Sequence, residues 1–446
     1  MMTDAMPALV PLSGWGRTPT SVARVHAARG VDDVVEVIRS RRERGVVARG
    51  EGRSYGDAAQ NAGGVVVDVR ALDDLHVRGT SVRVGAGMRL GPLIEALLPQ
   101  GLFVPVTPGT RYVTVGGLVA ADVHGKNHHS AGSWGHHIQE LRLVDGTGAM
   151  RTLAPHGPDP DAFWATVGGM GLTGVITEVT FTALPVNSSR IAVTTSRHGS
   201  LAEVRHALRK ADVHAEYSVA WIDCLDAQGR GIVSTGRHMD DGHLDPRPPS
   251  PRLGIPRDVP LGVVTRPTVG LFNQAWFRWS GRPRSDVPTS LWSYFYPLDG
   301  VTDWNRLYGK RGFIQYQIAV PDDAEDVIDE ALQTLRTAGS PSFLAVLKRF
   351  GNGNEAPLSF PLPGWTLALD IPATIPDLAQ ALDALDRSVA SAGGRHYLAK
   401  DSRMSSAALR AGYPRIDDWL RVRSRLDPHQ VFQSDLGRRL SLTAPG

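Results

Sequence analysis

Glycine is concentrated in one part of this chain, and this concentration limits what the chain can fold into. The sequence of 446 residues contains 48 glycines, and half of them lie between Gly45 and Gly174. Glycine tolerates positive φ angles and lets the main chain approach another group closely. The stretch therefore predicts one of two structures, a loop-rich all-β unit or a main chain wrapped around a large cofactor.

Composition excludes several other classes of protein. Cys224 is the only cysteine, which rules out an internal disulfide framework and thiolate-based zinc or iron–sulfur sites. The net charge of +3 is too small to argue for nucleic acid as a partner. No segment approaches the ~18 consecutive apolar residues of a spanning helix, and the start lacks a basic signal-peptide region. We expect a cytoplasmic protein without a signal peptide or transmembrane helix, with association with the inner face of the membrane left open.

Apolar spacing predicts two halves that differ in the length and order of their helices and strands. In the N-terminal half, helices at 31–44 and 92–98 alternate with strands at 65–68, 141–144 and 174–184. From residue 189 onward, strand–helix–strand units recur and predict a second domain, a sheet with helices on one face. The units are 191–195, 201–210 and 217–223; 313–320, 323–338 and 343–347; and 365–370, 375–392 and 396–399.

Two further segments of the C-terminal half stand apart from these units. Residues 236–289 are rich in Pro, Arg and Gly and also carry Phe272, Trp276 and Trp279. We expect a flexible excursion there, and the sequence favours a lid and a membrane contact equally. The last stretch, 417–440, predicts an amphipathic helical tail.

Glycine-rich motifs give candidate phosphate sites. Residues 169–174 match G-x-G-x-x-G, but a strand rather than a helix follows, and 186–195 contains no acidic residue, so a Rossmann fold is not expected. The loops at 49–57 and 108–117 fit anion binding by main-chain N–H groups as well as they fit simple turns.

Histidines cluster at positions 124, 128, 129, 136 and 137. No carboxylate or thiolate joins them within this segment, so we predict no metal site. A hydrogen-bonded loop histidine, or a histidine beside a redox ring, is favoured instead.

Four candidate polar residues lie on or directly after predicted strands of the second domain. Lys400 follows a strand that could aim its ammonium into a cleft, although its residue type alone favours a solvated side chain. Gln315 and Gln317 share one face of a strand, where they could bind sugar hydroxyls or face solvent. Lys348 and Phe350 form a similar pair on one face.

Several of these segments together resemble one family. They are Gly50-x-Gly52-Arg53-Ser54-Tyr55-Gly56-Asp57, Pro108-Gly109-Thr110 to Val115-Gly116-Gly117, Asp122-x-His124-Gly125-Lys126-Asn127-His128-His129, Phe163 to Gly169, and Tyr397-x-x-Lys400-Asp401-Ser402-Arg403. The chain closely resembles the decaprenylphosphoryl-β-D-ribose 2-oxidase family, which comprises flavoproteins of the vanillyl-alcohol-oxidase type. The resemblance covers nearly the whole chain and is weakest at 236–289.

The resemblance implies a two-domain α+β fold. An FAD-binding domain of residues 1–188, completed by 395–446, would flank a substrate-binding domain of residues 189–394. FAD would be held without a covalent link. The implied cofactor contacts are Ala48, Arg49, Gly50, Glu51, Gly52, Arg53, Ser54, Tyr55, Gly56, Asp57, Ala58, Gly109, Thr114, Val115, Gly116, Gly117, Ala121, Asp122, Val123, His124, Ile176 and Tyr397.

The resemblance also implies a reaction. The C2 hydroxyl of a polyprenylphosphoryl-β-D-ribose would be oxidised to a ketone, and a separate NADH-dependent keto-reductase would complete 2-epimerisation to the arabinose form, a precursor in cell-wall biosynthesis. Lys400 would orient the hydroxyl and stabilise the developing oxyanion, with Tyr55 and His124 as relay members. The implied substrate contacts are Lys126, Trp221, Gln315, Gln317, Lys348, Phe350 and Lys400.

Departures from the family pattern occur at three positions. Thr366 and Ala368 stand where relatives often have Asn and Cys, and Val219 stands where Ser is common. Without that cysteine, covalent capture by nitroaromatic inhibitors of the family should fail. Two alternatives therefore stay open: an oxygen-using oxidase of a soluble sugar, alditol or nucleoside, and a non-catalytic flavin-binding scaffold for a reductase.

Overall fold

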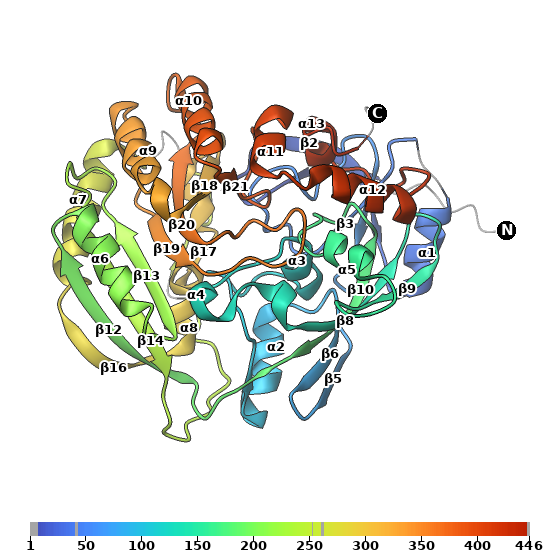
Figure 1. The fold of residues 1–446 in the computed structure, drawn as a ribbon, viewed down its shortest axis with the longest axis horizontal. Helices are drawn as coiled ribbons and strands as arrows, with labels where there is room; N and C mark the ends of the chain where they lie inside the picture. The colour runs from blue at the N-terminus through green and yellow to red at the C-terminus, as the bar shows by residue number, and fades with distance from the viewer. Residues whose placement is uncertain (1–7, 41–42, 252, 260–262, 444–446) are drawn as a thin grey trace.

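The computed structural model describes residues 8–40, 43–251, 253–259 and 263–443. Two small sheets form the half of the molecule drawn at the right of Figure 1. The first has strand order β1-β2-β4-β3 and the second β5-β6-β10-β8-β9. Their strands are β1 (Leu9–Ser13), β2 (Thr20–Ala27), β3 (Val46–Arg49), β4 (Val65–Asp68), β5 (Leu75–Arg78), β6 (Ser81–Gly85), β8 (Ile138–Val144), β9 (Met150–Leu153) and β10 (Val175–Thr182).

Short helices join and cover these strands. They are α1 (Val31–Arg39), α2 (Leu90–Leu97), α3 (Val115–Ala120), α4 (His128–Ala131) and α5 (Pro160–Thr166), and a short pair of strands, β7 (Leu102–Phe103) and β11 (Leu184–Pro185), lies beside them. Helix α1 buries Val34, Val37 and Ile38 but ends earlier than the predicted residue 44. The run that follows contains only Ser, Arg and Glu up to Gly45, so it has no apolar side chain to extend the buried stripe.

The end of the chain returns to this half of the molecule. Helices α11 (Ser406–Gly412), α12 (Ile416–Leu426) and α13 (Asp435–Arg439) lie beside the N-terminal strands in Figure 1. The N–H of Val46 donates to the carbonyl of Val431, and the indole of Trp419 donates to the carbonyl of Ala165. The predicted helical tail is thus an integral part of the first half.

The other half is an eight-stranded sheet with order β16-β12-β14-β13-β19-β20-β18-β21. All of its neighbouring strands run antiparallel. Its strands are β12 (Arg190–His198), β13 (Tyr217–Ile222), β14 (Gly231–His238), β16 (Arg284–Ser290), β18 (Phe313–Pro321), β19 (Ala345–Phe350), β20 (Gly364–Pro372) and β21 (Arg395–His396). Helices α6 (Leu201–Ala211), α9 (Asp326–Thr337) and α10 (Leu378–Ser391) cover one face through a shared apolar core.

The sheet repeats one motif twice. Helix α6 joins β12 to β13, with β14 between them, and helix α9 joins β18 to β19, with β20 between them. The predicted strand–helix–strand units are therefore present, but the strands that each helix joins are not neighbours. The two repeats meet where β13 pairs with β19.

The predicted excursion at 236–289 has regular structure in its described part. It contains helix α7 (Arg266–Trp279) and most of β16, which forms an edge of the large sheet. It also contains β15 (Leu253–Gly254), which pairs in parallel with β17 (Val301–Thr302) beyond the excursion. Helix α8 (Leu291–Phe295) follows β16. The expected flexibility of this segment stays a prediction.

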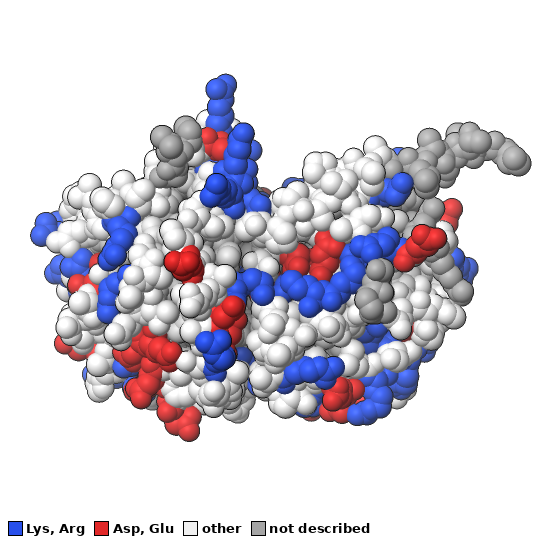
Figure 2. Space-filling view, turned by 90° about the horizontal axis from the view of Figure 1, so that it is seen from above, with Lys and Arg blue, Asp and Glu red and all other residues white. Residues whose placement is uncertain are grey.

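The face of the molecule seen from above (Figure 2) carries charges of both signs. On the face seen in Figure 2, Lys and Arg side chains alternate with acidic ones and with large uncharged areas. Within the described part of the chain, no helix is long and apolar enough to cross a membrane.

Candidate active site

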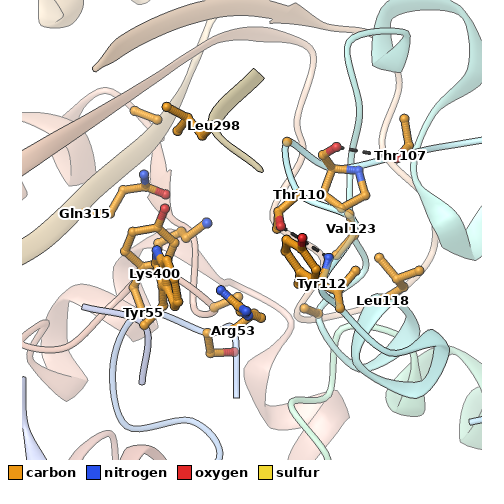
Figure 3. A pocket seen from close by; sticks show the side chains of 18 of the residues that line it. Arg53, Tyr55, Thr107, Thr110, Tyr112, Leu118, Val123, Leu298, Gln315 and Lys400 are labelled. Atoms are coloured by element: carbon orange, nitrogen blue, oxygen red, sulfur yellow. Dashed lines mark hydrogen bonds between the residues drawn. The ribbon is translucent and has the colours of Figure 1, made fainter. Parts of the chain in front are cut away.

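A cavity of about 800 Å³ lies between the two halves and is lined by both. The large sheet contributes the face that its helices leave free. The loops of the first half contribute residues 48–55, 107–110, 112–114, 116–118, 120, 121 and 123–126. Figure 3 shows Tyr55, Lys400 and Gln315 on one wall, with Thr110, Tyr112 and Val123 opposite them. Such a cavity is large enough for an extended ligand.

The loop after β3 presents a row of main-chain donors to this cavity. Residues 50–54 all line it, and among the described residues none of their N–H groups has a protein acceptor. Residues 50–54 are half-buried, and their N–H groups remain available to a group in the cavity, so the row offers a site for an external acceptor. A phosphate group matches consecutive N–H donors of this kind.

Several glycines leave room that a side chain would fill. A Cβ atom at Gly109 or Gly171 would meet nothing within 4 Å, and both residues line the cavity. At Gly50, by contrast, a Cβ atom would collide with the Thr114 side chain. The main chain is therefore packed tightly behind the wall and is bare on the side that faces the cavity, as the close approach of a large cofactor requires.

The residues after α3 form one side of the cavity. Ala121, Val123 and His124 line it, and the hydroxyl of Tyr397, also in the lining, donates to the carbonyl of Ala121 at 2.9 Å. The Tyr397 and His124 ring centroids lie 5.0 Å apart. These aromatic rings could pack beside a flavin.

His124 is held in its neutral form. Gln317 Nε2 donates to His124 Nε2 at 3.0 Å and to Thr366 Oγ1 at 3.3 Å. Burial, together with Lys348 and other neighbouring cations, lowers the pKa of His124 well below its usual value. Its Nδ1 is buried without a protein partner among the described residues. Thr366, one of the departures from the family pattern, thus fixes the Gln317 amide.

Lys400 is buried beside Tyr55. Its Nζ lies 3.8 Å from the centre of the Tyr55 ring, and the N–H of Tyr55 donates to the carbonyl of Ala399 at 2.9 Å. Burial lowers the pKa of Lys400 to about 7, although the nearby Asp370 opposes this effect. Asp370 accepts from Gln315 Nε2 at 2.5 Å, and burial raises its pKa to about 7. Lys400 therefore lies in the cavity wall, where the resemblance puts it, and not in open solvent, as its residue type alone would favour.

Two more lysines line the cavity without carboxylate partners. Lys126 Nζ donates to the carbonyl of Tyr294 at 2.5 Å, and Lys348 Nζ donates to the carbonyl of Gly125 at 3.4 Å. Burial lowers the pKa of Lys126 to about 7 and that of Lys348 to about 8. Both carbonyls are weak compensation for a buried charge, so this part of the cavity favours an anionic group.

Most of the residues implied by the resemblance line the cavity, and five lie behind its wall. Asp57 is paired with Arg439, Asp122 accepts hydrogen bonds from Ser133, Ser359 and Asn354, and Phe350 packs against His124 and His128. Gly56 packs against the carbonyl of Asp401, and Val115 belongs to the apolar core. These five support the walls, and their direct contact with a ligand stays a prediction.

Sequence reasoning missed part of the lining. Residues 297–299 and 301–304 close one side of the cavity, with Asp299 accepting from the N–H of Arg111, and no motif in the sequence marks them. Met170, Gly171 and Gly174 of the rejected G-x-G-x-x-G segment also line it. Glycine at position 171 is the sequence feature that could have identified this segment, because its φ of +74° is one that glycine adopts readily.

The cysteine and two of the clustered histidines lie outside the cavity lining, whereas the three positions that depart from the family pattern lie within it. Cys224 is buried outside the lining, with its Sγ against the carbonyl of Ser342 and its pKa raised by burial to about 12. His129 and His137 bond main-chain carbonyls. The described residues contain no group of three or more His, Cys, Asp or Glu side chains arranged to hold a metal ion. Val219, Thr366 and Ala368 line the cavity.

Two family models match parts of the chain. A model described as an FAD binding domain matches residues 22–154, and one described as D-arabinono-1,4-lactone oxidase matches residues 322–440. The first confirms the predicted FAD cofactor, and together they confirm the predicted two-domain α+β flavoprotein fold.

Curated relatives match over nearly the full length. Decaprenylphosphoryl-β-D-ribose oxidase of Mycolicibacterium smegmatis is 42% identical, covering 97% of each chain. Alditol oxidase of a Streptomyces species is 26% identical over 96% of this chain and 98% of its own. L-gulono-1,4-lactone dehydrogenase of Mycobacterium tuberculosis is 23% identical over 95% of this chain and 96% of its own.

Proposed function

The chain belongs to the decaprenylphosphoryl-β-D-ribose oxidase family, and from this membership we propose that it oxidises the C2 hydroxyl of a polyprenylphosphoryl-β-D-ribose to a ketone. It is an FAD-dependent oxidoreductase. The observation that carries the choice of substrate is the trio Lys126, Lys348 and Lys400, which line one cavity without forming a salt bridge among the described residues. A phosphorylated sugar offers these cations the negative charge that they lack, whereas a neutral sugar or alditol does not.

We assign FAD to the first half, residues 1–188 and 395–446, and the sugar to residues 189–394. The N–H groups of 50–54 suit the pyrophosphate, and Ala121, His124 and Tyr397 suit the ring system. When bound, FAD supplies the acceptor for the hydride that leaves the sugar C2. The division is supported by the lining, because the bare main chain comes from the first half and Gln315, Gln317 and Lys348 come from the second.

Lys400 is the residue that acts on the C2 hydroxyl in this proposal. A lysine with a pKa near 7 exists in both forms at neutral pH, so it can take the hydroxyl proton or stabilise the developing oxyanion. Tyr55, against which Lys400 packs, and His124, which Gln317 orients, are the relay members. Lys126 and Lys348 hold the sugar-linked phosphate.

Two partners complete the proposal. Oxidation alone yields a keto sugar, so 2-epimerisation to the arabinose form requires a separate NADH-dependent keto-reductase. A polyprenyl carrier is held in a bilayer, so the protein is expected to touch a membrane surface from the cytoplasmic side.

Anaerobic titration of the yellow holoenzyme tests the substrate. Polyprenylphosphoryl ribose should bleach the flavin absorbance, and ribose, alditols and nucleosides at equal concentration should not. Bleaching by the soluble compounds alone would establish the soluble-sugar oxidase instead. Absence of bleaching by every candidate, together with tight reductase binding, would establish the non-catalytic scaffold.

A further inference from the structure

Helix α7 (Arg266–Trp279) contacts the rest of the protein through an unusually polar face. Asn273 Nδ2 donates to Asp223 Oδ1 at 2.7 Å, and Arg230 Nη2 donates to Gln274 Oε1 at 2.7 Å. Phe277 lies on the same side, with the Arg230 guanidinium 4.6 Å from its ring centre. The buried side chains of α7 are Val269 and Asn273. Surface helices normally turn a continuous apolar stripe inward, so an inward face with one buried apolar side chain is unusually polar.

The apolar side chains of α7 face outward. Leu271 is 75% exposed, Trp279 67%, Phe272 44% and Trp276 41%. At 100° per residue these four positions fall on one side of the helix, opposite Asn273 and Phe277. Phe272 and Trp276 border the protein, because the Phe272 ring lies 5.9 Å from that of Phe343 and Trp276 lines the cavity. Leu271 and Trp279 are the most exposed of the four and are left free for an outside partner.

The surroundings of the apolar face are basic. Arg266, Arg278, Arg282 and Arg284 are all exposed on α7 or just after it. Over residues 263–290 the only acidic side chain is Asp286, which pairs with Arg237. Exposed Trp with flanking Arg is the composition of helices that lie in the interface of an anionic bilayer.

The apolar face also adjoins the active-site cavity. Trp276 and Ser280 belong to the lining, and the Phe272 ring stacks on Trp276 with centroids 5.9 Å apart. The cavity continues inward from there along the free sheet face, through Ile232 and Trp221. An apolar chain that leaves the bilayer at α7 would therefore enter the cavity without crossing water.

We propose that the outward apolar face of α7, with its flanking arginines, docks on an anionic phospholipid surface and passes the lipid-linked substrate into the cavity. The passage of substrate rests on the proposed function, whereas the docking itself does not. The lipid phosphates would pair with the arginines, and Leu271 and Trp279 would insert into the acyl region.

Vesicle co-sedimentation of the full-length holoenzyme tests the docking. Vesicles of phosphatidylcholine with phosphatidylglycerol should bind the protein, and vesicles of phosphatidylcholine alone should bind it more weakly. The double variant L271S/W279S should bind about tenfold more weakly or worse, because two large apolar side chains no longer enter the bilayer. Val213, 71% exposed after α6, provides the control V213S, which should bind like the parent protein.

Three results would overturn the docking. One is no binding of the parent protein to anionic vesicles, and a second is equal loss in L271S/W279S and V213S. The third is a parent protein that sediments as a dimer and a double variant that sediments as a monomer but binds vesicles as well as the parent does. That result would assign the face to a second copy of the chain.

Anaerobic bleaching separates this inference from the function. A short-chain, water-soluble polyprenylphosphoryl ribose should bleach L271S/W279S at the parent rate, whereas a long-chain substrate embedded in vesicles should bleach the variant more slowly. If neither substrate bleaches the parent protein while vesicles still bind it, the proposed function fails and the docking stands.

Discussion

At the scale of single residues, the proposed chemistry depends most on the side chain of Lys400. Lys400→Ala should keep the yellow colour, because the N–H groups proposed to grip FAD belong to residues 50–54. Anaerobic bleaching should slow by at least about a hundredfold, the usual effect of losing an acid–base group. Stopped-flow absorbance measures both properties. Lys310→Ala, at an exposed lysine, is the control, and normal bleaching by Lys400→Ala would remove Lys400 from the mechanism.

The three cavity lysines should make ligand binding depend on pH. Burial lowers the pKa of Lys126 and Lys400 to about 7 and that of Lys348 to about 8, so each loses its charge as pH rises through that value. Affinity for a phosphorylated ligand should therefore be highest below pH 7 and weaken by up to about tenfold per pH unit for each lysine between pH 7 and 9. Fluorescence titration with a non-reactive phosphosugar measures it. A flat profile over that range would contradict the assignment of Lys126 and Lys348 to the phosphate.

At the scale of elements, local patterns predicted much of the structure. Strand β4 and the helix at 92–98 were recognisable from apolar spacing, and the loop after β3, which we propose binds phosphate, was recognisable from its glycines. The position of β14 between β12 and β13 could not be predicted from local patterns, because strand order depends on contacts between distant segments. The wall formed by 297–304 was missed for the same reason: its residues acquire a role only from the loops they face.

The segment that begins at Asp122 is held by a single carboxylate. Its oxygens accept from Ser133 Oγ, Asn354 Nδ2, Ser359 Oγ and the N–H of Gly135, at 2.5–2.9 Å, and Asp122 is fully buried. Asp122→Ala leaves these donors unpaired, so the free energy of unfolding should fall by about 3 kcal/mol or more. FAD should also be bound more weakly, because the neighbouring residues Ala121, Val123 and His124 line the cavity.

Urea unfolding and the ratio of flavin to protein absorbance measure the two effects. Asp73→Ala, at an exposed position, should change neither. A stable Asp122→Ala protein that retains full flavin occupancy would show that the segment is fixed by other contacts.

At the scale of the whole molecule, the two ends of the chain close one site together. Arg439 in α13 donates to both oxygens of Asp57 at 2.7 and 2.9 Å and pairs with Asp401 at 2.8 Å. Asp57 follows the loop that presents its N–H groups to the cavity, and Asp401 follows Lys400. One guanidinium therefore joins the last helix, the predicted pyrophosphate loop and the segment that carries Lys400.

Arg439→Met should loosen all three at once, since it leaves two buried carboxylates without their cation. The expected loss in the free energy of unfolding at pH 7 is about 3–5 kcal/mol, with weaker FAD binding. Burial already raises the pKa of Asp57, and removing Arg439 should raise it further. A carboxyl whose pKa is raised on folding binds its proton more tightly in the folded state, so the penalty should shrink as pH falls from 7 to 5.

Arg421→Met, which removes an exposed pair with Asp418, should cost at most about 1 kcal/mol at either pH. A penalty for Arg439→Met that stayed constant between pH 7 and 5 would mean that packing of the arginine, and not its charge, joins the ends of the chain.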